Sequence, residues 1–203
     1  MSLPAKLGAA TLATGGTATA GYYAASYLSS QEDKSYRSKF LPAFLLDSSS
    51  KDDAYWNKRL ASLKQDAGAS GDLASLKNKE VNDLKKWCKD SLSKPFEEGK
   101  LFKDIDTYCT FKVLDKLGSN AISSETADAD SKWQNAFTAL GNITENIDTE
   151  LDGVKKTTNS GNDNATNKAV KGWCTKMYSK TYLGESDKLF GIAKKVCVSS
   201  GGT

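Results

Sequence analysis

The stretch that decides the fold is KKWCKDSLSKPF, Lys85–Phe96, which returns later in the chain as KGWCTKMYSKTY, Lys171–Tyr182. Each copy places Trp beside Cys and continues with Ser-Lys and an aromatic residue. Both copies then give Leu-Phe and end in a second cysteine, Cys109 in the first and Cys197 in the second. We interpret this self-similarity as two tandem structural units, because a recurring pattern of this length is typical of repeated architectures.

The apolar residues of both units recur at helical spacing. A Trp-led segment precedes each Trp-Cys block, with apolar residues at i, i+4 and i+7: Trp56, Leu60 and Leu63 in the first, Trp133, Phe137 and Leu140 in the second. Such stripes are typical of helices that bury one face, and no sustained β alternation occurs. We predict an all-α fold in which a helical bundle of two tandem related units follows an N-terminal membrane-anchor helix. The predicted structural core contains all four tryptophans: Trp56, Trp87, Trp133 and Trp173.

The same pattern divides the chain into segments. We expect an anchor or signal helix at 1–30, a linker at 31–49, a first helical unit at 50–118 and a second at 119–203. The two units are expected to pack as one domain, since 203 residues suit one or two small domains. The short apolar piece KFLPAFLLD, Lys39–Asp47, is compatible with either extended or helical structure.

Composition argues against several classes of function. The 28 basic and 25 acidic residues are well mixed and give a net charge of +3, so we expect no nucleic-acid partner. The chain has no histidine, which removes the commonest general base and metal ligand. Nucleotide-binding and nucleophile motifs are also missing from the sequence. We therefore expect a protein that is not an enzyme, with no catalytic residues, cofactor or metal.

The N-terminal segment Leu7–Leu28 carries no charge and is rich in Ala, Gly and Thr. As a helix it would be about 33 Å long, enough to cross a bilayer core. Lys6 precedes it, so the positive-inside rule places the N-terminus in the cytoplasm and the rest of the chain outside. An uncleaved signal anchor is the favoured interpretation. Cleavage before Gly21, or a flexible tail on a cytoplasmic protein, remain alternatives.

The four cysteines, Cys88, Cys109, Cys174 and Cys197, are disulfide candidates if the chain lies outside the cell. Four cysteines allow three connectivities. The repeat favours a bond within each unit, Cys88 to Cys109 and Cys174 to Cys197, at nearly equal separations. The alternative is four free thiols in a core. A zinc site is disfavoured, because the cysteines lack paired CxxC spacing.

The complete pattern resembles a known group of proteins. The start MSLPAKLGAATLATGG, the Trp-led helices and the blocks Trp87-Cys88 and Tyr108-Cys109-Thr110 are similar to the large paralogous families of haemotropic mycoplasmas. The resemblance implies membrane-anchored, surface-displayed proteins of wall-less bacteria that live on red blood cells, without established enzymatic activity. The second unit departs from it, because Val196-Cys197-Val198 replaces Tyr-Cys-Thr.

These observations favour a single-pass protein of the cell membrane whose C-terminal domain is extracellular. We expect it to be a surface antigen or a host-cell contact module that binds a host surface protein. A membrane-associated structural or assembly protein is the alternative from another class, with the small-residue helix driving self-association. A secreted helical protein, cleaved near Gly21, is a further alternative.

Overall fold

A computed structural model describes residues 34–145, 147–160 and 163–199. Nine α-helices occur in these ranges, and the only β pairing within them consists of isolated bridges. The predicted all-α class is confirmed. The anchor helix predicted within 1–30 lies outside the described residues. Within the described ranges, every helix is too short or too polar to cross a bilayer.

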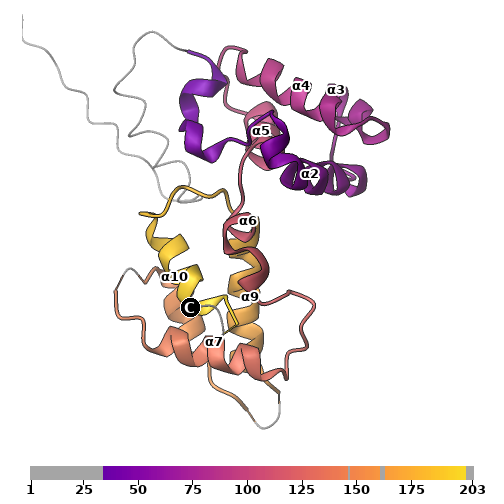
Figure 1. The fold of residues 1–203 in the computed structure, drawn as a ribbon. Coiled ribbons are helices and arrows are strands. Elements are labelled where there is room, and N and C mark those ends of the chain that lie inside the picture. Colours follow the sequence, from indigo (N-terminus) through magenta and orange to yellow (C-terminus); the bar gives the residue numbers. More distant parts are fainter. Residues whose placement is uncertain (1–33, 146, 161–162, 200–203) are drawn as a thin grey trace, which may run out of the picture.

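The first half of the chain forms one group of helices. Its main members are α2 (Asp53–Gln65), α4 (Val81–Leu92) and α5 (Lys100–Cys109), which pack against one another. Short elements complete the group: η2 (Tyr36–Lys39), η3 (Pro42–Phe44), η4 (Ser50–Asp52), α3 (Gly71–Ser75) and η5 (Leu76–Asn78). Figure 1 places this group above the second.

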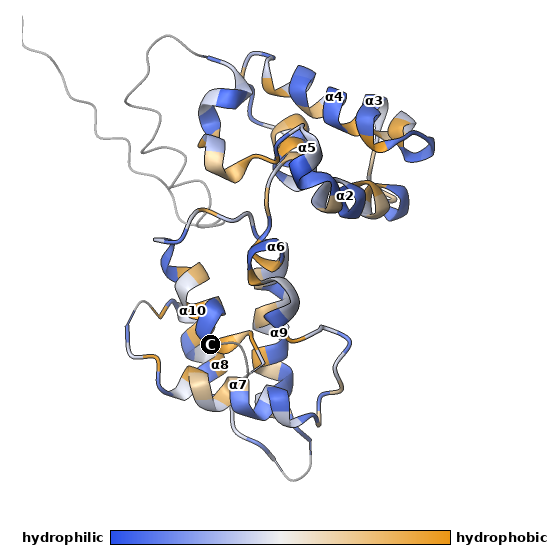
Figure 2. Cartoon of the chain, in the orientation of Figure 1, coloured by the Kyte–Doolittle hydropathy of each residue, from blue (hydrophilic) through white to orange (hydrophobic). Residues whose placement is uncertain are grey.

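The second group contains the remaining helices. They are α6 (Val113–Leu117), α7 (Ser131–Gly141), α8 (Thr149–Lys155), α9 (Ala165–Ser179) and α10 (Lys188–Val196), with η6 (Gly118–Asn120) after α6. Helix α9 packs against α6, α7, α8 and α10 and is the centre of the group. Figure 2 shows hydrophobic residues gathered on one side of many of these helices, as expected for amphipathic helices that share a core.

Aspartates begin three helices of the second group. The carboxylate of Asp130 accepts a hydrogen bond from the Lys132 N–H at the start of α7. Asp148 and Asp187 cap α8 and α10 in the same way. Helix N-termini leave backbone N–H groups without partners, and short acidic side chains satisfy them. These local signals fix where each helix begins.

The segment expected to be a linker, 31–49, is structured from residue 34 onward. Four of its apolar side chains, Tyr36, Phe40, Phe44 and Leu46, are buried in the core. The backbone N–H of Tyr36 also donates to the Lys94 carbonyl at 3.0 Å. The linker interpretation is therefore wrong for residues 35–46, because their aromatic side chains complete the core beside α4 and α5. The undecided piece Lys39–Asp47 contains the 3-10 helix η3.

Three of the four tryptophans are buried as predicted. Trp56, Trp133 and Trp173 expose 2%, 0% and 4% of their surface. Trp87 is only partly buried against the same core, so the prediction of four core tryptophans is met in full by three of them and only in part by Trp87. Helix α9 is covered by four neighbouring helices, whereas α4 packs against α2, α5 and η2. Fewer neighbours leave more of the α4 surface in contact with solvent.

An extended segment, Thr110–Lys112, connects the two groups and pairs with both. The Phe111 N–H donates to the Phe44 carbonyl at 2.8 Å, and the Phe111 carbonyl accepts from the Tyr182 N–H at 2.9 Å. Backbone hydrogen bonds on opposite sides of one residue thus tie the first group to the second. We call Thr110–Lys112 the junction segment.

A buried ion pair supports the junction segment. Arg59 of α2 donates to the Thr110 carbonyl at 3.0 Å and pairs with the carboxylate of Asp115 on α6. Both side chains are almost fully buried. Asp115 also accepts from the Lys112 N–H at 2.8 Å. A buried charge is costly unless it is paired and hydrogen-bonded, and both charges here meet that condition.

The side chain of Lys112 extends the same network into the second group. Its Nζ donates to the Asp106 carbonyl at 2.7 Å and to the Thr181 hydroxyl at 3.0 Å. Burial lowers the pKa of Lys112 below its ordinary value, and the nearby Asp106 carboxylate partly offsets that effect. The Thr181 hydroxyl in turn donates to Asp106 at 2.6 Å. These bonds give the junction segment side-chain contacts with both groups.

The unequal burial of the tryptophans predicts unequal costs of truncation. Replacing Trp133 with Ala removes a fully buried ring and should lower the free energy of unfolding by about 3–5 kcal/mol. Trp87→Ala removes a partly exposed ring and should cost less than half as much, because less apolar surface returns to water. Denaturant unfolding of both variants measures the difference. Equal costs would contradict the different environments of the two helices.

Candidate functional site

The structure joins the four cysteines in two pairs. Cys88 is bonded to Cys109 and Cys174 to Cys197, with Cα atoms 5.7 and 5.5 Å apart. This is the pairing that the sequence repeat favours. All four side chains are buried. The first disulfide links α4 to α5, and the second links α9 to Cys197, the residue that directly follows α10. Each group of helices therefore has its own covalent cross-link.

The charged residues form no evident metal centre in the described ranges. Within these ranges no group of three or more His, Cys, Asp or Glu side chains is arranged to hold a metal ion. The cysteine sulfur atoms are already committed to disulfides. The carboxylates of Asp66 and Asp128 are also engaged, since hydrogen bonds from Tyr108 and Lys171 respectively hold their pKa values below the ordinary range.

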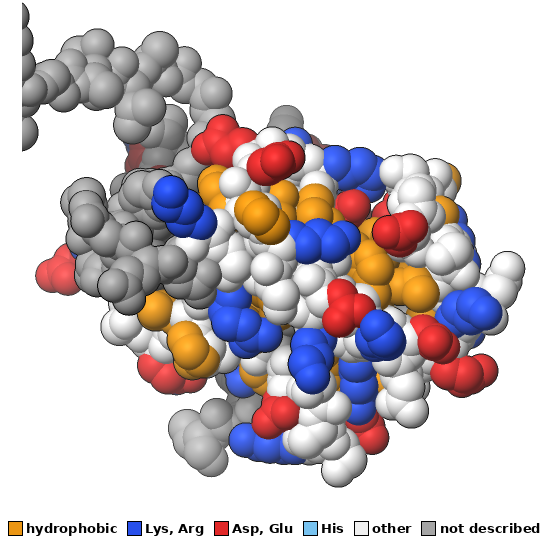
Figure 3. Space-filling model, turned by 90° about the horizontal axis from the view of Figure 1, so that it is seen from above, with side chains coloured by type: hydrophobic (Ala, Val, Ile, Leu, Met, Phe, Trp, Pro, Cys, Tyr) orange, Lys and Arg blue, Asp and Glu red, His pale blue; other side chains and the backbone are white. Residues whose placement is uncertain are grey.

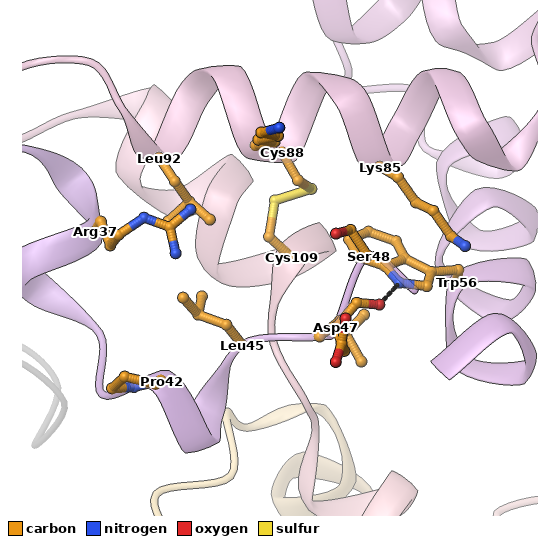
Figure 4. Close-up of a pocket in the computed structure, with 12 residues that line it drawn as sticks. Arg37, Pro42, Leu45, Asp47, Ser48, Trp56, Lys85, Cys88, Leu92 and Cys109 are labelled. Atoms are coloured by element: carbon orange, nitrogen blue, oxygen red, sulfur yellow. Dashed lines mark hydrogen bonds between the residues drawn. A yellow bond between two sulfur atoms is a disulfide. The ribbon is translucent and has the colours of Figure 1, made fainter. Parts of the chain in front are cut away.

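A cavity of about 300 Å³ lies beside the first disulfide, and we call it the Cys88 cavity. Its walls come from η2, η3, the loop before α2, α2 itself, α4 and α5. Figure 4 shows the disulfide between Leu92 and Trp56, with the Arg37 guanidinium directed toward Leu92. The lining residues are Arg37, Pro42, Leu45, Leu46, Asp47, Ser48, Trp56, Lys85, Cys88, Lys89, Leu92 and Cys109. This volume is at the lower end of the range for ligand pockets.

The loop at the mouth of the Cys88 cavity is held by local hydrogen bonds. The indole N–H of Trp56 donates to the Asp47 carbonyl at 2.6 Å. The Asp47 carboxylate accepts from the Ser49 N–H at 2.8 Å, which holds its pKa below the ordinary range. Lys85 pairs with the Asp53 carboxylate. The polar groups of Trp56, Asp47 and Lys85 are therefore already engaged in interactions within the fold.

Two cations of the lining are free of such commitments. Arg37 and Lys89 are exposed, and neither side chain has a hydrogen-bond or ion-pair partner within the described part of the chain. They give the lining two unpaired basic groups against the single carboxylate of Asp47, since the charge of Lys85 is already paired with Asp53. The cavity thus combines an apolar wall, sulfur atoms and a net positive rim. Such a surface favours a ligand with both an apolar part and a negative charge.

A second cavity, of about 360 Å³, lies between the loop after α7 and the start of α10. Two of its three acidic residues are used within the fold. Glu185 accepts from Lys194 at 2.8 Å and from the Tyr182 hydroxyl at 3.0 Å, and Asp187 caps α10. Lys188 and Lys195 of this cavity also lack an ion-pair partner within the described ranges, but its lining contains no aromatic ring. The Cys88 cavity is the stronger candidate, because its lining combines unpaired cations with the Trp56 ring and the disulfide.

Sequence reasoning found two residues of this site, Cys88 and Cys109, but assigned them a structural role. It missed Arg37, because the segment 31–49 was taken as a linker. A signal was present: Tyr36, Phe40 and Phe44 recur at intervals of four, which is typical of a buried face. The proline within that stretch hid the pattern, since it disfavours one continuous helix.

Comparison with known proteins adds no relative. No protein-family model, curated protein or solved structure matches this chain. The site must therefore be argued from its own geometry.

The two disulfides predict separate contributions to stability. Replacing Cys88 and Cys109 together with Ser should lower the free energy of unfolding by about 3 kcal/mol, since the bond restricts the unfolded chain. The matched pair Cys174 and Cys197 closes a loop of similar length and should cost about the same. Denaturant unfolding and non-reducing peptide mapping provide the readouts. A peptide that links Cys88 to Cys174 would refute the pairing.

Proposed function

We propose that this chain is a non-enzymatic binding module of two tandem units, displayed outside the cytoplasm and anchored in the membrane by its N-terminal segment. Its role is contact with a protein of the host-cell surface, or presentation as a surface antigen. The observation that carries the proposal is one internal disulfide in each of two similar helical units. Disulfides of this kind persist in oxidising, extracytoplasmic environments.

Recurring contacts support the tandem arrangement. In each unit the indole N–H of the leading Trp donates to a carbonyl in the preceding loop, Trp56 to Asp47 at 2.6 Å and Trp133 to Thr126 at 3.2 Å. A second recurring contact involves the lysine three positions before the first cysteine of each unit. That lysine pairs with a carboxylate near the start of the unit, Lys85 with Asp53 and Lys171 with Asp128.

The isolated β-bridges occur in the same order in both units and suggest unit boundaries that differ from those expected from the sequence. In the first unit Ser35 pairs with Pro95 and Leu45 with Thr110; in the second, Lys112 pairs with Thr181 and Ala121 with Val198. These pairs suggest units at 34–111 and 112–199 in place of 50–118 and 119–203. Helix α6 then opens the second unit, consistent with its packing against α9.

The mixed charge of the chain and of one face of the molecule favours protein contact over nucleic-acid binding. Figure 3 shows acidic and basic side chains interspersed on the face seen from above. A nucleic-acid interface requires a concentrated basic surface. The resemblance to the surface families of haemotropic mycoplasmas suggests a host red-cell protein as partner. The membrane part of the proposal rests on Leu7–Leu28, which lies outside the described residues.

Surface labelling tests the display of the module. A membrane-impermeant, amine-reactive biotin applied to intact cells should label the exposed lysines Lys58 and Lys168, because both would face the medium. Peptide mapping of the labelled protein gives the readout, and a cytoplasmic protein of the same cells serves as the control. The protein should also stay in the membrane pellet until detergent is added. Labelling only after lysis would reject display outside the cell.

A further inference from the structure

The strongest unexplained difference between the two groups of helices concerns one buried hydroxyl. Tyr178 lies on α9, four positions after Cys174. Its hydroxyl is buried and donates hydrogen bonds to two backbone carbonyl oxygens. The distances are 2.7 Å to the Ile122 oxygen and 3.0 Å to the Cys197 oxygen. Burial raises the pKa of Tyr178 to about 12, so the phenol remains protonated and able to donate.

The corresponding position in the first group is Leu92, four positions after Cys88 on α4. Its carbonyl partners also correspond. The Leu46 N–H donates to the Cys109 carbonyl at 3.0 Å, as the Ile122 N–H donates to the Cys197 carbonyl at 2.9 Å. Leu46 and Cys109 are therefore the counterparts of the two residues that Tyr178 binds.

These counterparts line the Cys88 cavity together with Leu92. Leucine is shorter than tyrosine and has no hydroxyl, so it fills less of the space and leaves one carbonyl without its donor. Within the described ranges, no group donates a hydrogen bond to the Leu46 carbonyl oxygen. The cavity thus occupies the region where the second group places a phenol.

The two unpaired cations of the rim have no basic counterpart in the second group, although Lys85 corresponds to Lys171. Lys89 follows Cys88 directly, whereas Thr175 follows Cys174. Arg37 lies two residues after the bridged Ser35, whereas Leu114 lies two residues after the bridged Lys112. The first group therefore lacks the phenol and carries two unpaired cations at the same site. An anion beside a phenolic ring fits that combination by charge.

We propose that the Cys88 cavity binds the tyrosine side chain of a partner protein in which acidic residues flank that tyrosine. The phenol enters beside Leu92 and donates to the Leu46 carbonyl. The flanking carboxylates meet Arg37 and Lys89 at the rim. Tyrosine suits such a pocket because it combines a large apolar ring with a polar tip. This inference rests on the proposed function, since it specifies the partner chemistry of that binding module.

Fluorescence anisotropy with a labelled peptide tests the inference. The probe is fluorescein-Gly-Glu-Tyr-Glu-amide, titrated with the full-length oxidised protein at low ionic strength. We expect saturable binding that weakens as salt is added, because salt screens the exposed cations. The same peptide with Phe in place of Tyr should bind about two- to tenfold more weakly, since it lacks the hydroxyl. Equal binding of the two peptides would overturn recognition of the phenol.

Matched variants locate the site. Leu92→Tyr supplies the ring from the protein itself, as Tyr178 does, and should abolish binding while thermal unfolding confirms the fold. Tyr178→Leu opens the counterpart position, which lacks the two unpaired cations, and should leave peptide affinity unchanged. Lys89→Glu reverses an exposed charge with little risk to folding and should weaken binding at least about fivefold. Unchanged binding in Lys89→Glu, or in a folded Leu92→Tyr, would place the peptide elsewhere and refute the proposal.

The remaining arms separate the possible failures. N-acetyltyrosine should bind much more weakly than the peptide. Equal affinity would overturn the inference of a partner protein and indicate a small aromatic acid as the ligand. No saturable binding by the wild-type protein would overturn the inference. The surface-labelling result is independent of these titrations. Peptide binding without surface labelling would reject extracellular display and keep the tyrosine site.

Discussion

The interaction on which the rest of the structure depends is the double backbone pairing of the junction segment, Thr110–Lys112. The backbone of Phe111 is hydrogen-bonded to Phe44 of the first group on one side and to Tyr182 of the second group on the other. The segment can satisfy both only if its neighbours are held at fixed positions. Cys109 precedes it directly, so the first disulfide fixes its start. The buried pair Arg59–Asp115 then ties α2 to α6 across it.

This constraint explains why the two groups share one core and yet differ in detail. Each group has its own disulfide and its own Trp-led helix, so each can vary its remaining contacts without losing its arrangement. The variation is visible at two matching sequence positions: Leu92 lies four positions after Cys88, and Tyr178 lies four positions after Cys174. In the second group the hydroxyl saturates buried carbonyls. In the first group a cavity takes its place, and the fold tolerates it because the neighbouring disulfide already holds α4 against α5.

Much of the fold could be predicted from the sequence, for identifiable physical reasons. The apolar stripes that start at Trp56 and Trp133 led to the correct all-α class, since period and burial are directly linked. The cysteine pairing followed from the repeat. The structured part of 31–49 was missed, because 3-10 helices are short and Pro42 interrupts the spacing of Tyr36, Phe40 and Phe44. The exposure of Trp87 depends on which helices cover α4, and tertiary packing of this kind leaves no local signal.

The candidate site illustrates the same limit from the functional side. Its cations, Arg37 and Lys89, lie far apart in the sequence and are unremarkable there, in a chain with 28 basic residues. The structure distinguishes them by their contacts. Neither side chain has a hydrogen-bond or ion-pair partner within the described part of the chain, whereas the neighbouring Lys85 is paired with Asp53. A structural cation is recognised by its partner, and an unpaired cation beside an apolar cavity is available to a ligand. In the tandem arrangement that we propose, the counterpart position supplies the comparison that one unit alone cannot, because it shows which side chain would otherwise fill the space.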